Sequence, residues 1–149
     1  HFDLKTILRY DGTNIITAPS TNSAHRYSSL GRYKNTPMAI GGGHSYGTNT
    51  VESLSNGYWN LEPLFPFASE LRYFSTATLN EILYVFGKSF SVHILKISQK
   101  SGGENSLNLA AKFDGTGWTQ IGRLMQGRYK HRSVVNGNTI MHIGGNGNL

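Results

Sequence analysis

The sequence predicts an all-β protein built from a repeated, four-stranded antiparallel unit, and two observations lead to this fold class. The first is a marker that occurs three times, in which an Arg-Tyr pair precedes an apolar run that ends in glycine. The second is the lack of any 12-residue window with a convincing 3.6-residue apolar period, which argues against helices. A repeat of about 40–50 residues with four short strands is typical of a β-propeller blade. The pairs begin at Arg26, Arg72 and Arg128.

The spacing within the repeat is nearly constant. The arginine precedes the glycine by 15 residues at Arg26 and Gly41, by 15 at Arg72 and Gly87, and by 16 at Arg128 and Gly144. A second marker lies between these units, with an apolar residue, a turn rich in Asp, Asn and Gly, and then a Trp or Ile. This order is typical of a β-hairpin. It occurs at 10–15, 54–59 and 113–118.

Each unit divides into four short strands, and the middle unit shows them best. Asn80 provides the turn between its first two strands, as 136–138 does in the last unit. The continuous apolar run 82–86 predicts a strand that is covered on both faces. The strands predicted for the middle unit are Arg72–Leu79, Glu81–Phe86, one strand within Ser91–Phe113, and Trp118–Ile121.

The order of these markers resembles the kelch repeat. In that family an apolar strand ends in Gly-Gly, a Trp follows, and an Arg precedes the next strand. The resemblance covers nearly the whole chain and implies the fold, as kelch-type β-propeller blades, more than any function. The residues that carry it are Gly41, Gly42, Trp59, Arg72, Gly87, Trp118, Arg128, Gly144 and Gly145.

Three departures from the kelch pattern set further expectations. Lys88 stands where the second glycine of the middle pair is expected, which predicts a looser turn. Ile15 stands where a Trp is expected, which predicts that the first unit is degenerate or edge-like. The middle unit carries extra residues, and its polar stretch near 98–108 is predicted to be an inserted loop.

The markers divide the chain into two complete blades between two half blades. The half blades are 1–19 and 125–149, and the complete blades are 20–64 and 65–124, the second with the insertion near 98–108. Joining the two half blades gives only three blades, whereas known propellers have at least about four. The resemblance therefore predicts a partial propeller: a piece of a longer, six-bladed one, or a unit that assembles with further propeller units of the same or another chain.

Composition excludes several classes of protein. The sequence has no cysteine, which removes disulfides, thiolate nucleophiles and Cys-based zinc sites. No apolar run approaches the roughly 20 residues of a membrane helix. The formal net charge of +6 allows an acidic partner. No motif beyond charge suggests nucleic-acid binding. The compartment stays open between secreted and cytoplasmic.

The candidate chemical sites have structural explanations. The double glycines lack the Lys-Ser/Thr of a phosphate-binding loop, and the two tryptophans suit packing between blades. His131 and His142 fall on adjacent strands, so a metal-ligand pair is conceivable, but no histidines have the spacing of a zinc site. The carboxylates form no pair placed by local spacing. We therefore assign no catalytic, cofactor-binding or metal-binding residue.

The sequence favours a non-enzymatic protein-interaction module. A structural component of an extracellular or filamentous assembly is the alternative, and a glycan-active propeller enzyme is the second alternative. Strand alternation would place Arg128, Lys130 and Arg132 on one basic face. Loops at one end of a propeller axis carry recognition. The partner contacts expected there are aromatic or amphipathic residues in loop segments: His44, Tyr46, Phe65, Phe67 and Phe90, with the packing of Phe65 and Phe67 under the next blade as the other explanation.

Overall fold

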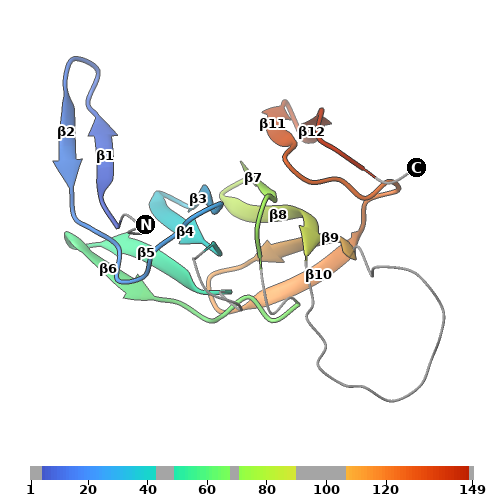
Figure 1. Cartoon of the computed structure of the whole chain (residues 1–149), viewed down its shortest axis with the longest axis horizontal. Helices are drawn as coiled ribbons and strands as arrows, with labels where there is room; N and C mark the ends of the chain where they lie inside the picture. The colour runs from blue at the N-terminus through green and yellow to red at the C-terminus, as the bar shows by residue number, and fades with distance from the viewer. Residues whose placement is uncertain (1–4, 43–48, 68–70, 90–106, 148–149) are drawn as a thin grey trace.

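The protein is an array of short antiparallel strands. A computed structural model describes residues 5–42, 49–67, 71–89 and 107–147 (Figure 1). Within these ranges there is no helix, hence none that could cross a membrane. The strands are β1 (Ile7–Tyr10), β2 (Ile15–Ala18), β3 (Ser29–Tyr33), β4 (Thr36–Ile40), β5 (Val51–Ser55), β6 (Tyr58–Leu61), β7 (Ser75–Leu79), β8 (Ile82–Ser89), β9 (Leu107–Phe113), β10 (Trp118–Arg123), β11 (Arg132–Asn136) and β12 (Thr139–Ile143).

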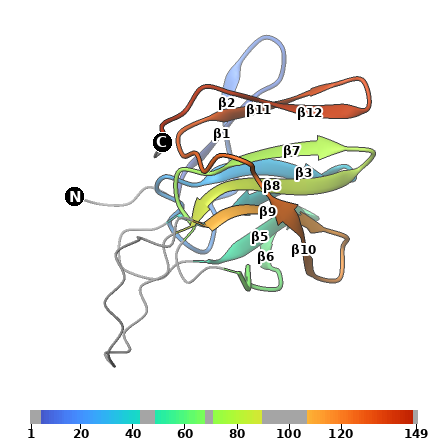
Figure 2. The same cartoon turned by 90° about the vertical axis from the view of Figure 1, so that its right-hand side faces the viewer.

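The strands form four sheets in the order of the sequence. Two sheets have four strands, β3-β4-β5-β6 and β7-β8-β9-β10, and two have only two strands, β1-β2 and β11-β12. Figure 1 shows the sheets along an open arc, with β1-β2 and β11-β12 at its two ends. The first strands of neighbouring sheets, β3, β7 and β11, lie beside one another, and Figure 2 shows β11 and β12 over β7. The predicted all-β class and the four-stranded antiparallel sheets are therefore confirmed.

The hydrophobic core lies between the two four-stranded sheets. Met38 and Ile40 from β4 and Leu83 and Val85 from β8 are almost completely buried in it. Successive strand residues point to opposite faces, so each of these strands contributes alternate residues to the core. The connection between β6 and β7 adds Phe65 and Leu71.

The hairpin turns follow from residues that tolerate left-handed backbone. Asn56 and Gly57 have φ of 53° and 83°, and Asn80 and Glu81 have φ of 50° and 64°. Two successive positive φ values are those of a type I′ turn, whose twist matches that of the strands it joins. The turn predicted at Asn80 lies between β7 and β8, and the turn predicted at 136–138 lies between β11 and β12.

Four strand limits differ from the prediction for the middle unit: the start of β7, both limits of β8, and the end of β10, which continues from Ile121 to Arg123. β7 begins at Ser75 rather than at Arg72, because Tyr73 has φ of 56° and breaks the extended backbone. β8 continues through Lys88 to Ser89, paired with β9, where the other second strands end at a double glycine. Lys88 therefore extends the strand instead of loosening a turn. The predicted insertion falls outside the described residues, except that 107–108 begin β9.

Both tryptophans attach their sheet to the segment that precedes it. Trp59 is buried, and its Nε1 donates to the carbonyl of Pro19 at 2.8 Å. The Nε1 of Trp118 donates to the carbonyl of Pro63 at 3.1 Å, and its ring packs against Phe65. The two indoles thus have the same structural role in successive sheets, between one unit and the next.

Candidate functional site

The residue two positions before each first strand has an unusual backbone conformation. Tyr27, Tyr73 and Lys130 have φ of 60°, 56° and 58°, and lie just before β3, β7 and β11. Left-handed backbone costs a residue with a side chain about 1–2 kcal/mol. Such strain persists only where the surrounding structure imposes it, and it is concentrated at functional sites. Three strained residues at one repeated position therefore mark a candidate site.

Backbone hydrogen bonds connect the three residues across the sheets. The N–H of Tyr73 donates to the carbonyl of Tyr27 at 3.1 Å, and the N–H of Lys130 donates to the carbonyl of Tyr73 at 2.8 Å. Each bond joins one sheet to the next and offsets part of the cost of the strained backbone. The three side chains are consequently held in a row at one end of the first strands.

The side chains in this row contact one another. The rings of Tyr27 and Tyr73 have centroids 4.7 Å apart, and the Lys130 ammonium lies 5.2 Å from the Tyr73 centroid and 5.9 Å from that of Tyr129. At the other end, the Arg26 guanidinium lies 4.6 Å from the Tyr27 centroid and donates to its hydroxyl at 2.7 Å. We call Arg26, Tyr27, Tyr73, Tyr129 and Lys130 the tyrosine ladder.

The ladder has a positive electrostatic character at its two ends. The hydrogen bond from Arg26 holds the pKa of the Tyr27 hydroxyl below its ordinary value. Burial raises the pKa of the Tyr73 hydroxyl, which also shares a hydrogen bond with Tyr27. Cation–π contacts fix the positions of Arg26 and Lys130 without neutralising their charge. The arrangement presents positioned cations and hydroxyl groups, which are groups that bind anions.

The ladder lies only partly where the sequence markers indicated. Arg26-Tyr27 and Arg72-Tyr73 occupy equivalent places, but the left-handed residue of the third unit is Lys130, not Tyr129. In the sequence this shift is indicated by the spacing from Arg128 to Gly144, which is 16 residues instead of the 15 found in the other two units. The left-handed backbone also interrupts alternation before Arg132, so the single basic face predicted for Arg128, Lys130 and Arg132 is wrong.

The predicted partner contacts do not form one described surface. His44, Tyr46 and Phe90 lie outside the described residues. Phe65 is completely buried and packs edge-on against Phe67 and Trp118, which makes it a core residue rather than an exposed anchor. Phe67 is partly buried against the same core and borders a small pocket with Asn108, Leu109, Gln120 and Arg123.

The double glycines and Arg128 have structural roles. Gly41 and Gly42 have φ of 61° and 81°, and a Cβ on either would lie 2.5 Å from a backbone carbonyl oxygen. Only glycine therefore fits where these backbones meet. Gly144 and Gly145 have similar φ values, and Arg128 donates to the carbonyl of Gly144 at 3.3 Å.

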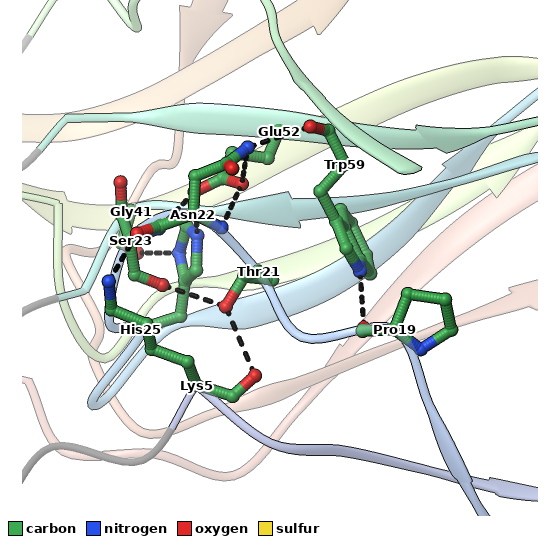
Figure 3. A network of polar contacts seen from close by, with 9 residues as sticks. All are labelled: Lys5, Pro19, Thr21, Asn22, Ser23, His25, Gly41, Glu52 and Trp59. Atoms are coloured by element: carbon green, nitrogen blue, oxygen red, sulfur yellow. Dashed lines mark hydrogen bonds and ion pairs between the residues drawn. The ribbon is translucent and has the colours of Figure 1, made fainter. Parts of the chain in front are cut away.

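A buried carboxylate anchors the segment that leads into the first complete sheet (Figure 3). Glu52 of β5 is completely buried and accepts the backbone N–H groups of Asn22 and Ser23, each at 2.7 Å. His25 places its Nε2 3.1 Å from the same carboxylate and its Nδ1 2.6 Å from the carbonyl oxygen of Gly41. Burial opposes ionisation, but these hydrogen bonds hold the pKa of Glu52 below its ordinary value. The network therefore has a structural role, since it holds the segment 22–25 against β5.

A second polar cluster joins the last hairpin to β7. The Nε2 of buried His131 lies 2.8 Å from the hydroxyl of Ser75, which contacts the hydroxyl of Ser133, and Ser133 lies 2.9 Å from His142 Nδ1. Burial lowers the pKa of His131 to about 4, so the ring is neutral at pH 7. Because Ser75 is buried, this cluster is a link between sheets and not an accessible nucleophile. No group of three or more possible metal ligands occurs among the described residues.

Comparison with known proteins gives a likeness in fold. No protein-family model matches the chain, and no curated protein matches it. Among solved structures it is similar to one titled "Structure of YjhT", with a TM-score of 0.73 and 17% sequence identity. The match covers 96% of this chain and 46% of that chain, so this chain spans about half the length of the structure that it matches. At this identity the likeness concerns the fold alone.

Proposed function

We propose that the two four-stranded sheets are complete kelch-type propeller blades, that the two two-stranded sheets are half blades, and that the chain is a non-enzymatic protein-interaction module. The repeated four-stranded sheets, the side-by-side first strands and the open arc support this arrangement. In such an arrangement the first strands surround the axis, and the tyrosine ladder crosses three successive units at one end of it. The ladder is the observation that carries the proposal.

The ligand class follows from the chemistry of the ladder. Arg26 and Lys130 are held in place by rings, so little side-chain entropy remains to be lost when they meet an anion. Tyrosine and arginine are also enriched among the residues that dominate binding energy at protein interfaces. The chain carries a formal charge of +6, which favours encounter with a negatively charged partner. The partner we propose is a protein segment rich in Asp and Glu.

Fluorescence anisotropy with a labelled oligoglutamate peptide tests this proposal. We expect binding that weakens as salt is raised, and at least a tenfold loss of affinity in the double variant Arg26→Gln/Lys130→Gln. The control is Lys34→Gln/Arg123→Gln, which removes the same charge away from the ladder and should change affinity much less. Equal losses in the two variants would show that net charge alone binds the peptide. Preference for a sulfated glycan over the peptide would also contradict a protein partner.

A further inference from the structure

Two phenol rings meet in the middle of the tyrosine ladder, one from each four-stranded sheet. Tyr27 precedes β3 and Tyr73 precedes β7. Their ring centroids are 4.7 Å apart, close to the short end of the range of about 4.5–7 Å that is usual for aromatic pairs. The ring planes are inclined by 39°, and the two hydroxyl groups share a hydrogen bond. The hydroxyl-bearing edges of the two rings are therefore directed toward each other.

This pair is held together from the backbone outward. The N–H of Tyr73 donates to the carbonyl of Tyr27 at 3.1 Å, and both residues have a left-handed backbone. Arg26 donates to the Tyr27 hydroxyl at 2.7 Å, and the Lys130 ammonium lies 5.2 Å from the Tyr73 centroid. Rotating either side chain away breaks one of the last two contacts. The two phenols consequently stay together while the chain is folded.

Tyr27 is the more accessible and the more readily oxidised ring of the pair. It is 42% exposed, so an oxidant in solution reaches it directly. The hydrogen bond from Arg26 holds the pKa of its hydroxyl below the ordinary value, which increases the share of phenolate. A phenolate gives up an electron more readily than a neutral phenol does, because the electron leaves a negatively charged group. A radical formed at Tyr27 then has the Tyr73 ring in contact with it.

We propose that Tyr27 and Tyr73 form a site of oxidative cross-linking, at which a haem peroxidase with hydrogen peroxide joins the two rings as dityrosine. Each phenol loses one electron and one proton, and together these reduce one peroxide molecule to two water molecules. The ring carbons beside the two hydroxyl groups form one carbon–carbon bond. Their hydrogens then move to the phenol oxygens, which restores both aromatic rings. The product ties the connection before β3 to the connection before β7, and it does not require the binding of an acidic segment.

Other tyrosines of the chain lie in different surroundings. Tyr33 and Tyr84 each make a ring contact with a phenylalanine, which has no hydroxyl to oxidise. Tyr10 in β1 and Tyr58 in β6 are 67% and 75% exposed, which is more than Tyr27. Exposed phenols of this kind couple between separate molecules when they collide, so their reaction depends on protein concentration. Coupling of a pair that is already in contact within one chain does not.

Peroxidase treatment of the full chain at several dilutions tests the proposal, with the products identified by mass spectrometry of the intact chain and of its proteolytic peptides. We expect a monomer that has lost two hydrogen atoms, shows dityrosine fluorescence, and gives a cross-linked peptide containing Tyr27 and Tyr73. Its yield should not change on dilution. Tyr27→Phe and Tyr73→Phe keep the rings but should each abolish this product, whereas Tyr58→Phe, the matched control at an exposed strand, should retain it.

Three results would overturn the proposal. The first is a product that is dimeric only and disappears on dilution, because exposed tyrosines of separate molecules would then be the reactive groups. The second is a monomeric cross-link that joins Tyr73 to Tyr129 or to another tyrosine instead of Tyr27. The third is oxidation of the wild-type chain without any dityrosine, while its circular dichroism spectrum remains that of a folded β protein.

Discussion

Neighbouring sheets are joined through single residues, and equivalent positions in the two four-stranded sheets carry different types of residue. His25 and Glu52 form a buried hydrogen-bonded pair in the first complete sheet. Leu71 and Ala111 occupy the same positions in the next sheet and are also buried. A buried charge is tolerated only when its hydrogen bonds are satisfied, and Asn22 and Ser23 satisfy those of Glu52. The repeat thus conserves the geometry of the junction while its chemistry changes from polar to apolar.

The buried His131 predicts that the last hairpin, β11-β12, loses stability in acid. His131 has a pKa of about 4 in the folded chain because of burial, and about 6.5 when unfolded. Between these two pH values the unfolded chain binds more protons than the folded chain. The stability that the neutral His131 ring contributes is therefore fully present above pH 6.5 and is lost as the pH drops toward 4. We expect a loss on the order of 2 kcal/mol between pH 7 and pH 5, measured by urea unfolding. His142, whose pKa burial also lowers, acts in the same direction.

The variant His131→Gln is the matched comparison for this acid sensitivity. Glutamine can still reach the hydroxyl of Ser75 but does not titrate, so most of the pH dependence should disappear. The variant His25→Gln, in the other polar network, should keep it. If wild type and His131→Gln lose the same stability on acidification, another group is responsible.

At the scale of elements, the sequence predicts strands and turns well where the signal is local. The Asn-Gly turn before Tyr58, the turn at Asn80 and the run 82–86 each depend on neighbouring residues, and each was identified from them. The late start of β7 was missed because Tyr73 is a strand-forming residue whose left-handed backbone is imposed by a bond to the neighbouring sheet. The Arg-Tyr pairs of the tyrosine ladder were identified as repeat markers, but the contacts that join them were not predicted, for the same reason. These contacts join residues about 50 positions apart, and no local pattern reports them.

Gly42, which follows β4, provides a test of how closely this strand end packs against the connection that precedes β3. Gly42 and Gly57 have nearly equal φ, 81° and 83°, but a Cβ on Gly42 would lie 2.5 Å from the carbonyl oxygen of Arg26, whereas a Cβ on Gly57 would meet nothing within 4 Å. Gly57→Ala should therefore cost only the left-handed penalty of about 1–2 kcal/mol. Gly42→Ala should cost clearly more, because the backbone of the preceding connection has to move.

Urea unfolding of the two variants measures this difference directly. The shared φ cancels the conformational term, so the excess loss in Gly42→Ala reports the close approach of the two backbones. Equal losses would mean that the double glycine serves its own turn only and does not hold the preceding connection against the sheet.

At the scale of the whole molecule, the open arc explains why the chain exposes large apolar side chains at its two ends. A sheet that is apolar on both faces is stable when neighbouring sheets cover both of them. The two complete sheets cover each other, and Phe65, Leu83 and Phe113 are consequently buried between them. The sheet β11-β12 lies beside β7 on one side only, and its Met141 and Ile143 are accordingly exposed. Leu8 and Tyr10 of β1, at the other end of the arc, are exposed as well.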